Sequence, residues 1–392
     1  MGTEAGARAA GWLGRRMTAP EGQSATFVEL FFDLVFVYAL TEVTGFTVEH
    51  LDWEGVLRAA LIFWLIWWGW AQWTWALNPA DTEHGLVRVG TLAATAIAFL
   101  MAVSVGDAFT DDGGLWFVVP YVLVRLVGLG LYALVASERR EQLAAVRTFG
   151  LASLAGLAVA VVGGMAEPEL RVWLWLAAIV LDFAAASIGG RLAGWDLHAR
   201  HFAERYALFV IIALGESLIV AAAGVAGADR TRELMSVALG SVVVTCLLWW
   251  CYFGWLKDAL EAHMEHLAEA AQSTFARDAY SRVHYVLIAG IVGVAVGFEE
   301  MVHHPAEAPR GEVLLALAAG VGLFLGATAL AWYRAQRQIL WPRLVAGATL
   351  ALAVAAMRDR EPALLLGLVA VVLAAIVAVE VRSRPDRRSE AR

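Results

Sequence analysis

Acidic side chains lie within long apolar stretches of this sequence, where an ionised group needs a partner or water. Glu29 and Asp33 are four residues apart in the stretch 27–46. On a helix this spacing puts both carboxylates on one face, where they could bind a cation, hold one proton between them or pair with an arginine. Glu204 and Glu216 lie in a later stretch of the same kind. We expect these four acids to line a path for an ion or a small solute.

The apolar stretches also contain a basic residue and further titratable groups. Arg125 and Asp182 each lie near the middle of a stretch. We expect Arg125 to pair with Asp33 or Asp182 and to act as a counter-charge. His284, which could change charge near neutral pH, Glu299 and Asp182 are secondary candidates for the path. The alternative is a network of buried ion pairs and hydrogen bonds that holds helices in register.

The elements that position these groups follow from the composition. The chain has 392 residues, of which 60% are hydrophobic and 17% are charged, whereas a soluble domain carries about 25% charged residues. The mean hydropathy is +0.66. The apolar residues form blocks of about 20, the length that crosses a bilayer as a helix. They do not alternate with polar residues as the strands of a membrane barrel do. We therefore predict an all-α integral membrane protein.

The apolar blocks predict about twelve transmembrane helices of the usual length. A longer connection at 257–279 is predicted to form an amphipathic cytoplasmic helix. The predicted spans are 27–46, 54–77, 86–108, 115–136, 148–165, 172–192, 203–224, 233–256, 280–302, 312–333, 340–357 and 362–381.

The distribution of basic residues predicts the orientation of these spans. If the N-terminus is cytoplasmic, most Lys and Arg residues, with Arg205 and Arg343 among them, fall in cytoplasmic segments, as the positive-inside rule requires. Both termini should then be cytoplasmic, in a bacterial inner membrane, and we expect no cleaved signal peptide. Trp67, Trp70 and Trp73 crowd one end of their span, which is typical of a membrane interface.

The sequence also suggests an internal repeat. Phe27 and Glu29 are matched by Phe202 and Glu204 in the second half of the chain. A tryptophan pair in the span 54–77 is likewise matched in the span 233–256. Six spans per half is an even number, so the two halves would share one orientation, as parallel repeats of transporters do. The predicted parts are a cytoplasmic segment 1–26, repeats 27–195 and 196–381, and a disordered basic cytoplasmic tail 382–392.

Other patterns point to no further chemistry. Cys246 and Cys251 lie in one apolar run and are interpreted as inert packing residues. Two histidine pairs, His198 with His201 and the pair at 263 and 266, lie in predicted loops. We interpret them as solvated helix faces rather than metal ligands. No phosphate loop, dinucleotide motif or serine elbow is present. We therefore predict no catalytic residue, no cofactor, no metal site and no nucleic-acid partner.

Several motifs resemble those of a known family. Phe27-Val-Glu29-Leu-Phe-Phe-Asp33-Leu-Val-Phe36 is similar to the opening signature of the bacterial low temperature requirement protein A family. The segment 204–217 and the residues around His284 resemble later parts of that family. The resemblance implies a bacterial inner-membrane protein linked by name to growth in the cold, and it supplies no molecular activity. The first motif also looks like the start of a potassium-permeable channel family, with Phe32 in place of a serine.

These patterns favour a transporter or channel for a small ion or solute, with acidic residues that couple movement to protons or cations. Membrane lipid and that ion or solute would be its partners. One alternative is a non-catalytic membrane sensor or scaffold, which would need a sizeable loop or soluble domain for a partner. A less favoured alternative is a membrane enzyme acting on lipid, which would gather polar groups at one membrane face, whereas the candidates here span several depths.

Overall fold

The computed structural model describes residues 16–20, 22–137, 140–189, 195 and 197–383. These residues form helices and no strand, apart from an isolated bridge between Thr18 and Ala80. Most of the predicted cytoplasmic N-terminal segment and of the basic tail, residues 1–15 and 384–392, lies outside the described residues. The chain divides into two compact units, and each is considered separately below.

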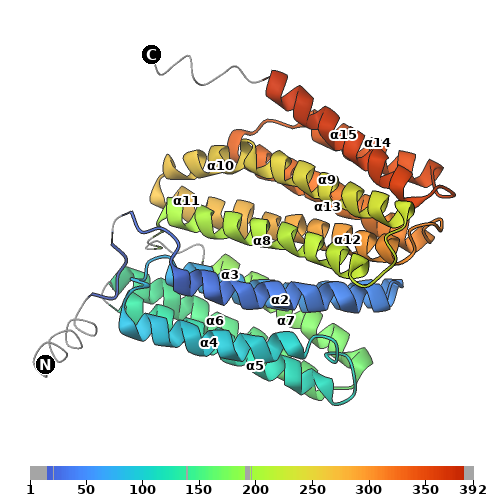
Figure 1. The fold of residues 1–392 in the computed structure, drawn as a ribbon. Coiled ribbons are helices and arrows are strands. Elements are labelled where there is room, and N and C mark those ends of the chain that lie inside the picture. Colours follow the sequence, from blue (N-terminus) through green and yellow to red (C-terminus); the bar gives the residue numbers. More distant parts are fainter. Residues whose placement is uncertain (1–15, 21, 138–139, 190–194, 196, 384–392) are drawn as a thin grey trace, which may run out of the picture. The chain divides into compact units, whose positions relative to one another are not determined.

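The first unit comprises residues up to Phe209 together with His263–Ser281. Within it, α4 packs against α2 and α5, and α6 packs against α5 and α7 (Figure 1). Its helices are α2 (Phe27–Glu49), α3 (Trp53–Leu77), α4 (Gly85–Val103), α5 (Gly113–Ala136), α6 (Arg140–Met165), α7 (Pro168–Gly189), the start of α8 (Ala199–Val225), α11 (Glu269–Phe275) and most of the π-helix η1 (Ala276–Arg282).

The second unit comprises Val210–Ala262 and Arg282–Arg392. In this unit α13 packs against α12 and α14, and α15 packs against α9 and α14. Besides the remainder of α8, its helices are α9 (Arg232–Phe253), most of α10 (Leu256–Glu265), α12 (Val283–His303), α13 (Gly311–Gln336), α14 (Trp341–Ala356) and α15 (Pro362–Arg382).

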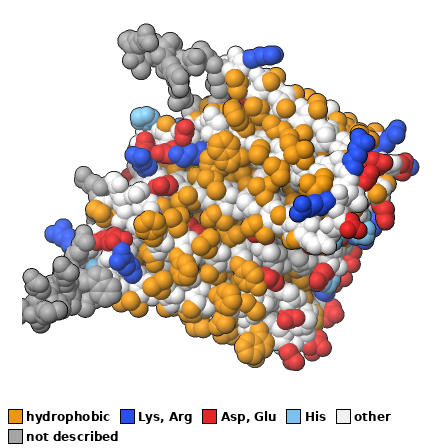
Figure 2. Space-filling model, viewed as in Figure 1, with side chains coloured by type: hydrophobic (Ala, Val, Ile, Leu, Met, Phe, Trp, Pro, Cys, Tyr) orange, Lys and Arg blue, Asp and Glu red, His pale blue; other side chains and the backbone are white. Residues whose placement is uncertain are grey.

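Nine helical segments of the described chain are long and apolar enough to cross a membrane. Helices α2 and α3 are not among the nine, and α14 is a shorter apolar helix. Large apolar side chains along the lengths of several helices are exposed, such as Phe99 (50%), Leu239 (65%) and Val371 (68%). Figure 2 shows hydrophobic side chains along the helices and charged side chains gathered mostly near helix ends. These features fit a multi-pass helical membrane protein.

The helix ends follow local chemistry. Asp52 precedes α3, and its side chain accepts a hydrogen bond from the Gly55 amide at 2.7 Å. Thr231 caps α9 in the same way, through the Leu234 amide at 3.2 Å. Such caps satisfy amides that have no partner within the helix. Helix α13 ends at Arg337, whose φ of 56° is left-handed, a common way to stop a helix.

Three interpretations of the sequence are wrong. Trp67, Trp70 and Trp73 are 1%, 0% and 0% exposed, so they are core residues rather than interfacial ones. Arg205 and Arg343, which were counted with the charges of the cytoplasmic segments, are 1% and 0% exposed and are bonded to buried carboxylates within helices. The connection 257–279 is not a single helix, because it forms α10, α11 and part of η1 with breaks between them.

Candidate functional site

Helix α2 presents Glu29 and Asp33 on one face, as their spacing predicts, and both side chains are completely buried. Both carboxylates are contacted by residues from the start of α8, and one also by a residue of α3. Glu29 also caps the first turn of α2. Its Oε2 atom accepts hydrogen bonds from the amide and the hydroxyl of Thr26, both at 2.9 Å. Glu29 therefore helps to start the helix as well as to form the site.

Arg205 of α8 joins the two acids. Its Nη1 atom donates to Oε1 of Glu29 at 2.6 Å. Its Nη2 and Nε atoms donate to the two carboxylate oxygens of Asp33 at 2.6 and 3.2 Å. A buried guanidinium that is bidentate to one carboxylate and also bonded to a second is fixed in orientation. The pair Glu29–Asp33 is thus bridged by one cation.

His201 and Trp70 complete the site. Nε2 of His201 lies 3.0 and 3.2 Å from the two carboxylate oxygens of Glu29. Nε1 of Trp70 donates to Oδ1 of Asp33 at 2.7 Å, and both side chains are buried. We call Glu29, Asp33, Trp70, His201 and Arg205 the acid–arginine cluster. All five belong to the first unit.

The ring of His201 lies between an amide and a carboxylate. The Asn78 amide is oriented by His198, because Nδ2 donates to the His198 carbonyl at 3.1 Å and Oδ1 accepts from the His198 amide at 2.7 Å. Nδ2 of Asn78 therefore faces Nδ1 of His201, at 3.4 Å. An amide NH₂ group is only a donor, so this contact suits a ring whose Nδ1 atom accepts while Nε2 donates to Glu29. This is the neutral tautomer of the ring.

The charges of the acid–arginine cluster do not balance in this arrangement. Glu29 and Asp33 carry two negative charges when both are ionised, Arg205 carries one positive charge, and the neutral ring of His201 carries none. With the ring of His201 neutral, one surplus negative charge is held away from water, where an uncompensated charge is costly; with the ring protonated, two positive charges face the two acids. The cluster is chemically suited to take up one proton or one small monovalent cation.

Glu204 lies beside the acid–arginine cluster but does not join it. It is half-buried, and its Oε2 atom accepts a hydrogen bond from the Ala25 amide at 3.0 Å. The segment that contains Ala25 is itself held to the α3–α4 connection, since the amide of Ala19 donates to the Pro79 carbonyl at 2.8 Å. Glu204 therefore fastens the segment before α2.

A second buried cluster surrounds Arg125 of α5. Its two terminal nitrogens donate to the two carboxylate oxygens of Asp182 at 3.0 and 2.9 Å. The hydroxyl of Tyr121 and the side-chain oxygen of Gln72 also accept from the guanidinium. The expected pairing of Arg125 with an acid is confirmed, and the partner is Asp182 rather than Asp33. One cation faces one anion here, so this cluster carries no surplus charge. Its hydrogen bonds connect α3, α5 and α7.

A third buried ion pair lies in the second unit. Arg343 of α14 donates to both carboxylate oxygens of Glu380 in α15, at 2.7 and 2.9 Å, and to the carbonyl of Cys251 at 2.7 Å. Nε1 of Trp255 also donates to Glu380, at 2.6 Å. This pair is also balanced in charge and ties α14 and α15 to the end of α9.

The remaining candidates lie in the second unit. Glu216 of α8 is 5% exposed, and the hydroxyl of its neighbour Ser217 lies 3.2 Å from that of Thr245. His284 is buried, with Nε2 2.8 Å from the hydroxyl of Tyr252. Glu299 is half-buried near the end of α12. These residues belong to a different unit from the acid–arginine cluster, and the expected common path stays a prediction.

Sequence reasoning missed three members of the acid–arginine cluster, namely Trp70, which it placed at the membrane interface, His201 and Arg205. His201 was assigned to a solvated helix face, which is wrong, because the side chain is 1% exposed and bonded to Glu29. Arg205 was counted with the charges of the cytoplasmic segments. The available signal was spacing, since His201 and Arg205 are four residues apart, like the acids they contact. Within the described residues, no group of three or more His, Cys, Asp or Glu side chains could hold a metal ion.

Comparisons with known proteins identify a relative and a family. An uncharacterized protein of Rhizobium meliloti (strain 1021) is 30% identical over 328 residues, which cover 81% of this chain and 78% of that protein. No solved structure matches the chain significantly. Residues 24–379, nearly the whole chain, match the family described as bacterial low temperature requirement A protein (LtrA). The chain therefore belongs to the bacterial low temperature requirement A family.

Proposed function

We propose that this protein is a transporter or channel for a small ion or solute, in which the acid–arginine cluster takes up one proton or monovalent cation. The observation that carries the proposal is that two buried carboxylates share one buried guanidinium, while the group that can change the charge balance is the titratable ring of His201. A network that only holds helices together gains nothing from a surplus charge, as the balanced pair of Arg125 and Asp182 illustrates. The surplus at Glu29 and Asp33 instead provides a place for a mobile cation.

The surplus charge also suggests how the site would work. While the cluster is closed to water, the bound proton or cation neutralises it and lowers the cost of burial. When water enters, both carboxylates can be solvated and the cation can leave. Half-buried Thr26 offers a route between Glu29 and solvent, because its hydroxyl contacts the Glu29 carboxylate. The same hydroxyl lies 3.1 Å from the hydroxyl of Thr82. Proton movement between Glu29 and solvent would pass the hydroxyl of Thr26.

We further propose twelve membrane spans in two parallel repeats, 27–195 and 196–381, with both termini cytoplasmic in a bacterial inner membrane. The contacts between α2 and α8 support the parallel arrangement. Glu29 of α2 contacts His201 of α8. One turn further along α2, Asp33 contacts Arg205, which lies one turn further along α8. The two helices therefore run in the same direction, as the first helices of two parallel repeats must. Membrane lipid and the transported ion or solute are the proposed partners.

The decisive experiment measures flux in liposomes that contain the purified protein. Asp33→Asn keeps the shape and most of the hydrogen-bonding capacity of the side chain while it removes the surplus charge. We expect this variant to insert and fold but to lose pH-dependent flux of protons, monovalent cations or small solutes. Glu216→Gln, which neutralises the other buried candidate, should behave similarly. The matched control is Glu54→Gln, because the side chain of Glu54 is 68% exposed, and it should leave flux unchanged.

The alternatives predict different results. A sensor or scaffold would give no flux above empty liposomes for any cation or solute, even with the wild-type protein. Flux that persists unchanged in Asp33→Asn would remove the acid–arginine cluster from the mechanism. A lipid-acting enzyme would instead alter the liposome lipids on incubation, which thin-layer chromatography detects.

A further inference from the structure

The oxygen atoms of Glu29 are occupied by hydrogen-bond donors. Its Oε1 atom accepts from Nη1 of Arg205 at 2.6 Å and lies 3.0 Å from Nε2 of His201. Its Oε2 atom accepts from the amide and the hydroxyl of Thr26, both at 2.9 Å, and lies 3.2 Å from the same Nε2 atom. Both oxygens of this carboxylate are therefore already engaged by the protein.

The oxygen atoms of Asp33 are occupied in the same way. Oδ1 accepts from Nη2 of Arg205 at 2.6 Å and from Nε1 of Trp70 at 2.7 Å, and Oδ2 accepts from Nε of Arg205 at 3.2 Å. Metal cations are held in proteins by several oxygen atoms, which replace water molecules around the ion. Apart from one hydroxyl, the groups on these two carboxylates are N–H donors, whose hydrogens repel a metal cation. The surroundings of the two acids therefore suit a proton better than a sodium or potassium ion.

The ring of His201 offers such a proton a basic atom. Its Nε2 atom is engaged by Glu29, whereas its Nδ1 atom lies 3.4 Å from Nδ2 of Asn78. That contact is longer than each of the contacts to Glu29 and Asp33 given above, and it is therefore weak. The ring itself is 1% exposed, but His198, which contacts Asn78, is half-buried, so this side of the ring is near solvent.

A proton on Nδ1 would balance the charges of the acid–arginine cluster. Glu29 contacts the ring from α2, and Asp33 on the same helix and Arg205 on α8 are the other charged members of the cluster. Helix α3 contributes an uncharged amide at its end. The connection that follows α3 carries Asp81 and His84, whose side chains accept hydrogen bonds from main-chain amides of their own turns. With the ring protonated, two positive charges face two negative charges.

We propose that the particle taken up by the acid–arginine cluster is a proton, that it binds to Nδ1 of His201, and that its binding turns the side-chain amide of Asn78. This inference rests on the proposed uptake of a proton or monovalent cation by the cluster. The proton comes from solvent and forms a bond with the lone pair of Nδ1, while Nε2 keeps its own hydrogen. The new N–H group then faces the NH₂ group of Asn78, and two donors cannot bond to each other.

The turn of Asn78 links the proton to the contact between the end of α3 and the start of α8. Nδ2 of Asn78 donates to the His198 carbonyl at 3.1 Å, and Oδ1 accepts from the His198 amide at 2.7 Å. Half a turn of the amide would bring Oδ1 to the new N–H group of the ring, but it would also break both bonds to His198. Proton uptake should therefore loosen the segment before α8 from the end of α3.

Magic-angle-spinning NMR of the whole protein in liposomes, labelled with ¹⁵N at histidine, measures the protonation of each ring nitrogen. We expect the His201 ring to change from neutral, with its hydrogen on Nε2, to protonated as the pH falls from about 8 to about 4. His201→Gln identifies the signal by its loss. His304→Gln is the control, because His304 is 60% exposed, and it should leave that signal unchanged.

Two further variants test the neighbours of the ring. Asp33→Asn should lower the midpoint of the His201 titration by about one pH unit, because it removes a negative charge that favours the protonated ring. Asn78→Ala should raise the midpoint, because no amide then has to turn when the ring is protonated.

Two further measurements test the identity of the ion and the turn of Asn78. The midpoint of His201 should be the same in choline chloride as in sodium or potassium chloride at equal ionic strength. Hydrogen–deuterium exchange of the peptide that contains His198 reports the bond from its amide to Asn78. Its protection, corrected for the intrinsic effect of pH on exchange, should fall as the ring is protonated in the wild type and stay constant in His201→Gln.

Several results would overturn the inference. They are a His201 ring whose protonation does not change between about pH 8 and pH 4, a midpoint that falls when sodium or potassium replaces choline, and protection of His198 that does not depend on the ring. If His201→Gln does not fold, the signal is identified as the one whose midpoint moves in both Asp33→Asn and Asn78→Ala, and the inference is rejected if no signal does so.

None of these measurements needs flux. A protein that carries ions across liposomes without titration of His201 would keep the proposed transport and lose this inference. A ring that titrates as expected in a protein without flux would keep the proton site and reject transport.

Discussion

The guanidinium of Arg205 holds the carboxylate of Asp33 through two hydrogen bonds, from Nη2 to Oδ1 at 2.6 Å and from Nε to Oδ2 at 3.2 Å. This bidentate contact fixes the register of α2 against the start of α8, because a shift of one residue along either helix would turn one partner away. The third bond of Arg205, to Glu29, uses the same cation for a second acid. Both acids therefore depend on a single guanidinium.

Removing that guanidinium should be severely destabilising. Arg205→Met fills a similar volume but leaves Glu29 and Asp33 buried without a cation. Loss of one member of a buried ion pair costs roughly 3–5 kcal/mol, and here two acids lose their partner. We expect a fall of at least that size in the free energy of unfolding, measured by SDS titration of the purified protein. Arg200→Met is the control, since Arg200 is exposed on the same helix, and it should change the free energy little.

Neutralising Asp33 should cost much less than removing Arg205. In Asp33→Asn the guanidinium still faces the carboxylate of Glu29, so the cluster becomes balanced in charge. The same substitution should restore part of the stability lost in Arg205→Met, because one of the two stranded acids disappears. The two single variants and the double variant form a thermodynamic cycle. Additive effects in that cycle would contradict a direct interaction between the two side chains.

The balanced pair of Arg125 and Asp182 gives a separate prediction. Arg125→Ala should lower the yield and the melting temperature, because Asp182 is then buried without its partner, at a cost of roughly 3–5 kcal/mol. A second change, Asp182→Asn, should recover part of that loss. The control is the pair of Arg88 and Glu83, whose side chains are 38% and 52% exposed. Exposed pairs contribute about 0–1 kcal/mol, so Arg88→Ala should leave the melting temperature nearly unchanged.

Several features of the first unit could be predicted from the sequence, because they depend on the spacing of residues within one helix or on the small number of buried charges. The shared face of Glu29 and Asp33 follows from helical spacing alone. The partner of Arg125 could be narrowed to two acids because few buried charges exist in the chain. Arg205 was missed because it lies near the start of the predicted span 203–224, where basic residues are counted with the cytoplasmic charges rather than as site residues.

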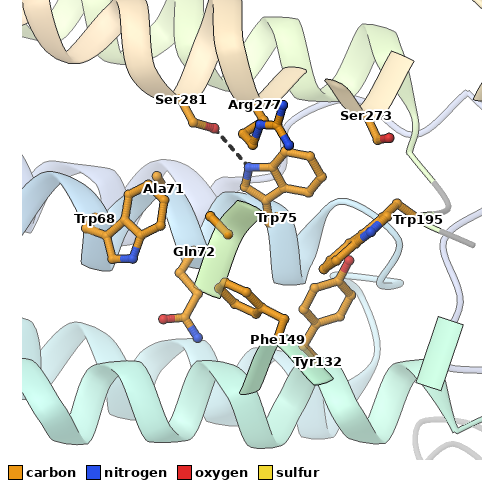
Figure 3. Close-up of a pocket in the computed structure, with 11 residues that line it drawn as sticks. Trp68, Ala71, Gln72, Trp75, Tyr132, Phe149, Trp195, Ser273, Arg277 and Ser281 are labelled. Carbon is orange, nitrogen blue, oxygen red and sulfur yellow. Dashed lines mark hydrogen bonds between the residues drawn. The ribbon is translucent and has the colours of Figure 1, made fainter. Parts of the chain in front are cut away.

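The rest depends on contacts between distant segments, which the spacing of one segment does not reveal. The walls of an aromatic cavity in the first unit come from α3, α5, α6, η1 and the segment before α8 (Figure 3). The tryptophans of α3 were assigned to the membrane interface because their crowding at one end is typical of it. The structure instead uses Trp70 as a donor to Asp33 and Trp67 as a donor to the Ser281 carbonyl.

The proposed orientation of the spans can be tested by reporter fusions. Fusions after Ala136 and in the C-terminal tail should report a cytoplasmic location, and fusions at Asp111 and Glu307 should report the exterior. The reason is the excess of basic residues in the segments assigned to the cytoplasm. A C-terminal tail that reports the exterior would contradict both the even number of spans and the parallel repeat.

Close packing of α12 on α13 should depend on the absence of a side chain at Gly290. A Cβ atom built there would lie 2.7 Å from the Gly320 carbonyl oxygen and 2.7 Å from the Phe324 amide nitrogen. Both are main-chain atoms and cannot rotate away, so Gly290→Ala must push the helices apart. Overpacking of this kind typically costs about 1–3 kcal/mol, and interfaces between membrane helices use small residues for this reason.

Gly326→Ala, on the partner helix α13, is the matched control, because a Cβ atom there meets nothing within 4 Å. Thermal unfolding of the purified variants should show a lower melting temperature for Gly290→Ala and an unchanged or higher one for Gly326→Ala. Equal melting temperatures for the two variants would mean that α12 and α13 do not approach as closely as described.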